Sequence, residues 1–354
     1  MKKFLKFFAI FVGLLLITSC AEEENSVQIA VVLDMRFATF NPWRERDWVA
    51  ELKHRHGQEN VVVYSLPEFS QSIAAIAESY DIVIIRHANA DYGRLREKRD
   101  DIFIILIEPQ EGFGSNADLV LSVDRLGMQR AFPAQARAMG AETLVYFYDS
   151  SIWEWDENAE SEEAYLRRMM REESEAAGLL FVEVDIKGAI QCGSSHAMFL
   201  SETLPLLLEE HGSDIVFFDL DNERTFWMWL GSDFIYLPMA KSWFEPNPID
   251  IALELALVTG SAYPNENFND IAYLIEGIRN VVNERNQSGR VASMPISTRF
   301  LFPIAAVEYA MQREYSLEQV MVNLIAEYTG VQNHGVILMA NENHVMVLLD
   351  WLVY

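Results

Sequence analysis

The chain contains little cysteine and little positive charge. Its 354 residues include two cysteines, Cys20 and Cys192, too few for a small fold held by disulfides. Lys and Arg number 27 against 53 Asp and Glu, a formal net charge of -26, and no Lys/Arg-rich run occurs. This balance argues against a nucleic-acid partner, because binding phosphate groups requires a positive surface.

The chain also lacks internal repeats and long Pro/Gly/Ser-rich linkers. It is rich in apolar residues instead: 51% are hydrophobic and 12% are aromatic. This content can build a large core, which excludes intrinsic disorder. At this length we expect one large two-lobed domain or two ordinary domains, joined by short crossover segments.

The N-terminus has the pattern of an export signal. A positive start, MKKFLK, precedes the apolar run Phe7–Ile17, which is too short to span a bilayer comfortably. The run leads into ITSC, which ends at Cys20 and resembles the lipobox of bacterial lipoprotein signal peptides, whose cysteine is acylated and becomes the first mature residue. We therefore predict a signal peptide over 1–19, lipidation of Cys20 and a lipidated tether over 20–26. The alternatives are an ordinary secretory signal and an uncleaved anchor.

A lipidated Cys20 predicts an extracytoplasmic protein, anchored to the cell membrane on its periplasmic or cell-surface side. Removing the lysines of the signal makes the remaining chain more acidic still, so anionic headgroups repel it and only the lipid holds it at the membrane. Cys192 is then left without a disulfide partner, and we interpret it as a small apolar residue.

One local pattern predicts the fold class: a helix ends at a glycine, and an apolar strand follows within a few residues. It occurs at HRHG (Gly57) before VVVYS, ARAMG (Gly140) before TLVYFY, SEAAG (Gly178) before LLFVEV and LEEHG (Gly212) before DIVFFD. Continuous apolar strands indicate a parallel sheet covered on both faces. Further strands are expected at Gln28–Leu33, Ile82–Ile85, Ile102–Ile107 and Leu119–Val123. We predict an α/β protein with two doubly wound parallel-sheet lobes and a cleft.

The C-terminal third adds helices and a strand pair. We expect helices at Asn247–Val258, Asp270–Arg285, Phe302–Met311 and Leu317–Tyr328, and strands at Gly335–Met339 and His344–Leu349. In the second of these helices Ile271, Leu274, Ile275, Ile278 and Val282 form an apolar stripe. We place 27–141 and 240–293 in lobe I, and 142–239 and 294–354 in lobe II.

The signal, tether and successive α/β units together resemble the type I periplasmic substrate-binding proteins. More narrowly, the chain is similar to an uncharacterised, domain-of-unknown-function family of bacterial lipoproteins with that fold, from roughly Asp100 to Tyr309. The similarity rests on RDDIFIILIEP, ADLVLSVDRLGMQRAFPAQARAMGAETLVYF, AGLLFVEVDI, LSETLPLLLEEHGSDIVFF and SGRVASMPISTRFLFPIAAVEYA. The resemblance implies a binding scaffold and includes no catalytic signature.

Three strand-end loops depart from that family. Its Phe-Pro-Arg-His-like stretch is Tyr148–Ser151 here, its Thr-Asn pair is replaced by Asp219–Asn222, and its cysteine/proline-rich loop by Met239–Trp243. Such loops face the cleft in this fold, so the resemblance transfers the scaffold and not the ligand.

Candidate ligand contacts follow the strands, because open α/β sheets bind ligands beyond the carboxyl ends of their strands. These loops are rich in aromatic residues, which suit a flat or ring-shaped ligand. The candidates are Asp34, Arg36, Phe37, Arg86, His87, Asn89, Tyr148, Asp149, Trp153, Asp219, Asn222 and Trp243. The alternative for the aromatic residues is closure of the lobe interface. For each polar residue the alternative role is a helix cap, an interlobe hydrogen bond or a solvated side chain.

Two partial motifs leave an enzyme as an alternative. VFFDLDNERT resembles the opening of haloacid-dehalogenase phosphatases, but Glu223 stands where that family has threonine. IVIIRHANA resembles the Arg-His start of histidine phosphatases, but it lies on the third strand and not the first. No phosphate-binding loop or zinc cluster occurs, so we expect no cofactor and no metal.

The sequence thus predicts a solute-binding protein that captures a small molecule, as part of an ABC-type uptake system with a separate permease or as a sensor. The alternatives are a phosphatase-like surface enzyme and a ligand-less structural or interaction lipoprotein on the same fold.

Overall fold

The computed structural model describes residues 26–33, 42–86, 92–108, 116–148, 150, 162–186, 193–218, 232–237, 271–341 and 343–354. The described elements form two compact units, one ending at Asp118 and one running from Leu119 to Tyr354, with Trp43–Trp48 grouped with the second. Both units combine helices with mainly parallel strands, which confirms the predicted α/β class. The four lobe boundaries given above stay a prediction.

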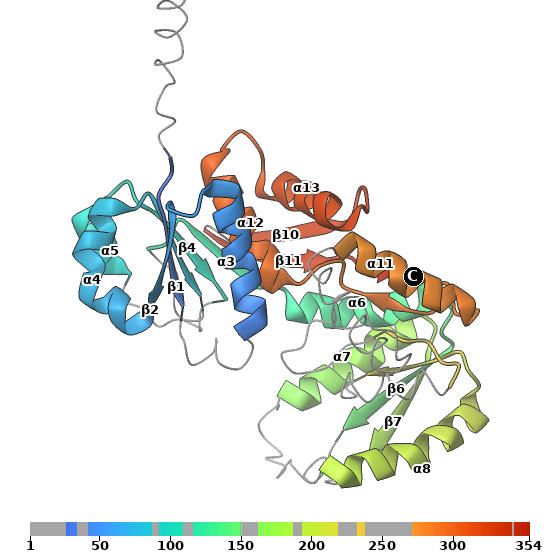
Figure 1. The fold of residues 1–354 in the computed structure, drawn as a ribbon. Helices are drawn as coiled ribbons and strands as arrows, with labels where there is room; N and C mark the ends of the chain where they lie inside the picture. Colours follow the sequence, from blue (N-terminus) through green and yellow to red (C-terminus); the bar gives the residue numbers. More distant parts are fainter. Residues whose placement is uncertain are drawn as a thin grey trace, which may run out of the picture. The chain divides into compact units, whose positions relative to one another are not determined.

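The first unit holds four parallel strands in the order β4-β3-β1-β2. The connections β1 to β2 and β2 to β3 run in opposite directions across this sheet, so right-handed crossovers place α3 and α4 on opposite faces, as Figure 1 shows. The elements are β1 (Ile29–Leu33), α3 (Pro42–His56), β2 (Val61–Ser65), α4 (Leu66–Ser79), β3 (Ile82–Arg86), α5 (Gly93–Lys98) and β4 (Phe103–Ile107).

The sequence of α4 accounts for both its start and its packing. The Ser65 hydroxyl accepts a hydrogen bond from the Glu68 N–H, and the Glu68 carboxylate accepts one from the Ser65 N–H, which together form a capping box. The backbone N–H of Ser65 accordingly lowers the pKa of Glu68. Phe69, Ile73 and Ile76 then recur at helical spacing and are buried, and α4 packs on β1 and β2.

The second unit begins with a parallel three-stranded sheet in the order β7-β6-β8. Its core is aromatic: the Phe132 and Phe218 ring centres lie 5.2 Å apart, and the Tyr146 ring stacks on Phe218 at 5.4 Å. The helices α7 and α8 lie on opposite sides of this sheet (Figure 1). The elements are α6 (Arg125–Ala138), β6 (Thr143–Tyr148), α7 (Glu162–Ala176), β7 (Leu180–Asp185), α8 (Gly193–His211) and β8 (Ile215–Phe218).

The C-terminal part of this unit returns to the strand β5. There β11 pairs with β5 in parallel and with β10 antiparallel, so the predicted strand pair at the end of the chain is a hairpin. The short strands β9 and β12 pair antiparallel. The elements are β5 (Leu119–Val123), α11 (Ile271–Glu284), β9 (Ala292–Ser293), α12 (Thr298–Met311), α13 (Leu317–Thr329), β10 (Val336–Asn341), β11 (His344–Leu349) and β12 (Leu352–Val353).

Local predictions agree with these elements. The apolar stripe on α11 is buried at all five predicted positions. The glycines that were expected to end helices have positive φ: 97° at Gly57, 94° at Gly140, 74° at Gly178 and 77° at Gly212. The helix predicted over 247–258 lies outside the described residues.

Candidate functional site

Two of the twelve predicted ligand contacts, Arg86 and Tyr148, lie in the described part of the chain. The other ten and the predicted lipidation site lie outside the described residues: Asp34, Arg36, Phe37, His87, Asn89, Asp149, Trp153, Asp219, Asn222, Trp243 and Cys20. The described candidates occupy one position in each unit, at the carboxyl end of a strand.

In the first unit, Arg86 is a charged residue at the end of a core strand. It is the last residue of β3, in register with Leu33 of β1 and Ile107 of β4, and its side chain is 1% exposed. A guanidinium buried to this depth is costly unless its donors and its charge are compensated, and Arg86 does have interaction partners in the structure. Its planar fork of five N–H donors suits the oxygens of a carboxylate, a phosphate or a sugar.

Directly after β4, Glu108 adopts a left-handed backbone conformation with φ 47°. It follows Ile107, the residue that pairs with Arg86, so it lies at the same edge of the sheet. A non-glycine residue in this region is uncommon, and such residues concentrate at functional sites. The sequence had no signal for it, because glutamate has no preference for positive φ.

In the second unit, Tyr148 ends β6 beside Asp185, the last residue of β7. The Asp185 carboxylate accepts hydrogen bonds from the Ser150 N–H at 3.1 Å and from the Ser150 hydroxyl at 2.6 Å. The Ile186 N–H donates to the Tyr148 carbonyl at 2.8 Å. These bonds join Tyr148 and Ser150 to the end of β7, and Ser150 and Asp185 are polar residues at strand ends that were missing from the predicted set.

A cationic side chain holds the ring of Tyr148. The Arg167 guanidinium of α7 lies over this ring at 4.3 Å from its centre, within range of a cation–π interaction. The same guanidinium binds both carboxylate oxygens of Glu183 on β7, and Arg171 donates to Glu183 at 2.7 Å. Hydrogen bonding to Arg167 lowers the pKa of Glu183, and hydrogen bonding to Glu183 raises the pKa of Arg167. Both partners of this pair therefore stay charged.

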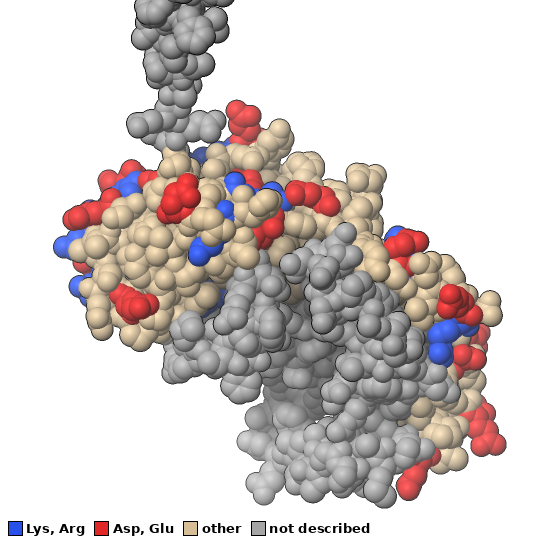
Figure 2. Space-filling model, viewed as in Figure 1, with Lys and Arg blue, Asp and Glu red and all other residues tan. Residues whose placement is uncertain are grey.

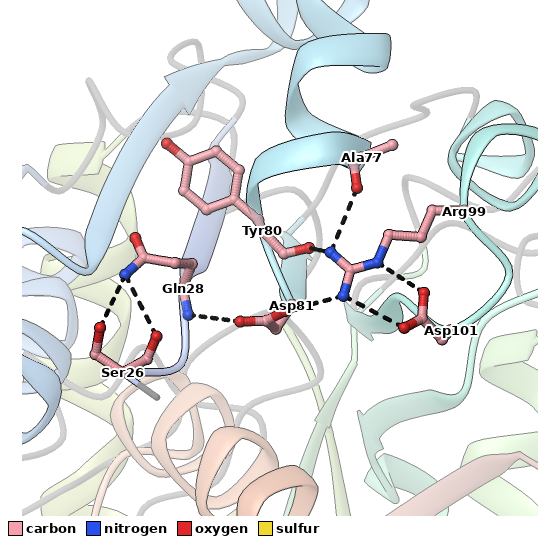
Figure 3. Close-up of polar contacts among 7 residues, drawn as sticks. All are labelled: Ser26, Gln28, Ala77, Tyr80, Asp81, Arg99 and Asp101. Atoms are coloured by element: carbon pink, nitrogen blue, oxygen red, sulfur yellow. Dashed lines mark hydrogen bonds and ion pairs between the residues drawn. The ribbon is translucent and has the colours of Figure 1, made fainter. Parts of the chain in front are cut away.

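Figure 3 shows a second polar network, at the other end of the first unit's sheet. Arg99 donates to Asp81 at 2.9 Å, to Asp101 at 2.7 Å and to the Tyr80 carbonyl at 2.9 Å, and Asp81 accepts from the Gln28 N–H at 3.0 Å. Gln28 and Asp81 directly precede β1 and β3, so the network lies at the amino ends of these strands, opposite Arg86. Its hydrogen bonds tie strand starts together, which is a structural role.

A serine–histidine pair joins β5 to the C-terminal hairpin. The Ser122 hydroxyl lies 2.7 Å from Nε2 of His344. Such a pair forms two parts of a hydrolytic triad, which also needs a carboxylate to orient the histidine. Among the described residues no Asp or Glu is hydrogen-bonded to His344, so the pair is not a triad there.

Charges and candidate metal ligands give no further site in the described residues. Figure 2 shows Asp and Glu interspersed with Lys and Arg over the visible described face, without a broad basic patch. No group of three or more His, Cys, Asp or Glu in the described ranges could hold a metal ion. No helix within these ranges is long and apolar enough to cross a membrane.

The structure has the α/β fold with mainly parallel strands that is typical of the type I periplasmic-binding-protein-like class. A candidate transcriptional regulator from Clostridium difficile 630 shares it, with a TM-score of 0.70 over 93% of this chain and 99% of that one at 16% identity. Residues 72–292 match the family described as "Protein of unknown function (DUF3798)". The chain belongs to this family, which confirms the resemblance to an uncharacterised family with this fold.

Other solved structures are similar at TM-scores too low to define a fold. A sugar ABC transport substrate-binding protein from Bordetella parapertussis 12822 has a TM-score of 0.34 at 14% identity, covering 92% of this chain and 88% of that one. A LacI family regulator from Arthrobacter sp. FB24, in complex with lactose, has a TM-score of 0.39 at 13% identity, covering 92% and 98%. No curated protein matches this chain.

Proposed function

We propose that this protein captures a small molecule outside the cytoplasm, for uptake or sensing, while lipid on Cys20 holds it at the membrane, and that it catalyses no reaction. The observation that carries the proposal is the burial of Arg86 at the carboxyl end of β3. This is the end of an open parallel sheet at which α/β proteins bind ligands. A guanidinium at this end of the sheet can donate hydrogen bonds to an anionic or polar group of a ligand.

The side chains at these strand ends indicate the chemistry of the ligand. Arg86 offers donors to carboxylate, phosphate or hydroxyl oxygens. Tyr148 offers a half-buried ring whose orientation Arg167 fixes, and a preorganised aromatic face suits stacking on a flat or ring-shaped molecule. We therefore propose a small ligand whose acceptor oxygens bind to Arg86 of the first unit; taken by itself, the Tyr148 ring of the second unit favours a ring-shaped molecule.

A thermal unfolding screen tests this proposal. Sugars, nucleosides, amino acids and vitamins are each added to the full-length protein, and a ligand at 100 times its Kd is expected to raise the free energy of unfolding by about 2.7 kcal/mol. Native mass spectrometry of protein purified from its own host identifies a retained small molecule directly. No shift in the screen together with no retained molecule would contradict ligand capture.

A matched pair of arginine variants separates binding from folding. Arg86→Gln is expected to abolish the ligand-induced shift. Arg99→Gln, which removes the network at the opposite strand ends, is expected to lower the unfolding temperature but to keep the shift. If Arg86→Gln retains full ligand affinity, Arg86 is not a ligand contact. Circular dichroism of both variants checks that they are folded.

Membrane attachment is tested at the two cysteines. Labelling with an alkyne-bearing fatty acid is expected to mark the wild-type chain and Cys192→Ser, but not Cys20→Ser. Cys20→Ser is also expected to leave the membrane fraction. Persistent membrane association of the unlabelled variant would contradict lipid anchoring. For an uptake role, a permease and an ATPase are expected to be encoded beside this protein.

A further inference from the structure

The C-terminal hairpin carries an exposed apolar stripe on one face. In the β10–β11 register Ile337 pairs with Leu348 and Met339 with Met346, so these four side chains point to the same side of the sheet. Ile337 is 51% exposed, Met339 41% and Met346 38%, whereas Val345, Val347 and Leu349 on the other side of β11 are buried. We call Ile337, Met339, Met346 and Leu348 the hairpin stripe.

The strand that bears half of this stripe also has an open edge. In the described sheet β10 is the terminal strand, paired with β11 on one side only (Figure 1). Natural edge strands are usually protected by charged residues, proline or bulges. The sequence VILMAN of β10 contains neither a charge nor a proline. Its outer row of backbone N–H and C=O groups can therefore accept another strand.

Charge determines which partner fits this edge. The twelve residues of β10 and β11 include no Lys, Arg, Asp or Glu, although 23% of the whole chain is charged and its net charge is -26. A basic partner would find no counter-charge in these strands. An uncharged apolar strand fits this edge, and β10 of a second copy is such a strand. Although each molecule is acidic, no carboxylate of one β10 strand would then face a carboxylate of the other.

We propose that β10 pairs antiparallel with β10 of a second copy of this chain, across a two-fold axis. Two identical strands related by a two-fold axis perpendicular to the sheet are antiparallel by symmetry, so each presents its unpaired donors to the acceptors of the other. The two hairpin stripes then lie on the same side of one continuous sheet, where Ile337 and Met339 approach the same residues of the partner copy. This step rests on the proposed lipidation of Cys20: attachment of both copies to one membrane would raise their effective concentration and favour the pair.

A charge-swap experiment tests the homotypic contact. Full chains with two different affinity tags are co-expressed, and one tag is used to capture the other from detergent extracts. Two wild-type chains are expected to capture one another. When both chains carry Met339→Glu, the amount captured is expected to be at least tenfold lower. Capture of Met339→Lys by Met339→Glu is expected to recover, because opposite charges then meet across the axis. Equal self-capture of wild type and Met339→Glu overturns the proposal.

The control uses another exposed apolar residue of the same unit. Leu206 on α8 is 63% exposed, and the variants Leu206→Glu and Leu206→Lys are expected to self-associate as wild type does. Raising the salt concentration is expected to strengthen wild-type capture, since it screens the repulsion between two acidic molecules. Weaker capture at high salt points to an ionic contact with some other occupant and overturns the proposal.

A cross-linking measurement covers the case in which a charged variant does not fold. Met339→Cys, treated in membranes with a short bis-maleimide, is expected to give a covalent dimer, and Leu206→Cys is not. The unsubstituted chain, which keeps Cys192, provides the background. The proposal is overturned if Met339→Cys gives no covalent dimer, or if Leu206→Cys gives the same yield of dimer. It is also overturned if Met339→Cys is cross-linked to a different protein in place of the second copy.

Discussion

The Arg167 guanidinium lies over the Tyr148 ring, with 4.3 Å between the guanidinium carbon and the ring centre. The carboxylate of Glu183 holds this guanidinium through two hydrogen bonds. The arrangement joins α7 to β6 and β7 and leaves Tyr148 with a fixed orientation. It makes Arg167 a positioning residue for a predicted ligand contact.

Replacing Arg167 by Met should destabilise the second unit. Among the described residues, the variant leaves Glu183, which is 20% exposed, with Arg171 as its one remaining ion-pair partner, and it removes the cation over Tyr148. We expect the free energy of unfolding to fall by about 1–3 kcal/mol, measured by urea denaturation. The control Arg168→Met removes the ion pair with Glu172, whose charged atoms lie 4.0 Å apart and whose arginine side chain is 55% exposed. This change should lower the free energy of unfolding by less than about 1 kcal/mol. Equal effects would contradict the assigned role.

Acidification should destabilise the protein through His334. This side chain is 8% exposed, its Nε2 lies 2.7 Å from the Asp350 carbonyl oxygen, and burial lowers its pKa below the usual 6.5. Below pH 6.5 the unfolded chain therefore binds a proton that the folded chain excludes, so the free energy of unfolding decreases as the pH falls. We expect His334→Gln to flatten the profile between about pH 7 and about pH 5. The same profile in wild type and variant would contradict this, and exposed His54→Gln is the control.

Gly140 should tolerate asparagine better than alanine. Its φ is 94°, and a Cβ placed there meets no atom within 4 Å, so backbone strain is the main cost of substitution. We expect Gly140→Ala to lose about 1–2 kcal/mol of stability in chemical denaturation. Gly140→Asn should lose less, because asparagine enters the left-handed region more readily. Equal costs for the two variants would argue against strain as the cause.

Truncating Phe132 should have one of the larger effects in the second unit. Its ring is fully buried and lies against Phe218 in an edge-to-face contact. Phe132→Ala should lower the free energy of unfolding by about 3–5 kcal/mol, since it removes apolar contact and leaves a cavity. Leu126→Ala, on the same helix but 41% exposed, should change it by less than about 0.5 kcal/mol. Calorimetry or denaturant titration of both variants measures the difference.

Features that depend on neighbours in the sequence could be predicted. The buried stripe of α11 follows from helical spacing alone, and the positive φ of Gly140 follows from its place after a helix and before a strand. Strand positions could be predicted for the same reason. A continuous apolar run such as IVIIR lacks the alternation of polar and apolar residues that a strand with one exposed face shows.

Features that depend on distant residues could not be predicted. Arg86 could be placed at a strand end, but its burial is set by β1 and β4 on either side. The bond between Arg99 and Asp81 requires the chain to return through α5, and the pair of Ser122 and His344 joins residues 222 positions apart. No periodicity or motif encodes such pairings, because they depend on strand order.

The pairing of β11 with β5 has a consequence for how the chain is made. His344 aligns with Val120, so a strand from the middle of the sequence is completed by one from its end. The strand pairs of the first unit, in contrast, all join residues between Ile29 and Ile107. During synthesis, the first unit can therefore gain its sheet before β11 has emerged. The second unit cannot complete its pairing with β5 until β11 has been made, which leaves the β5 edge unpaired on that side for longer.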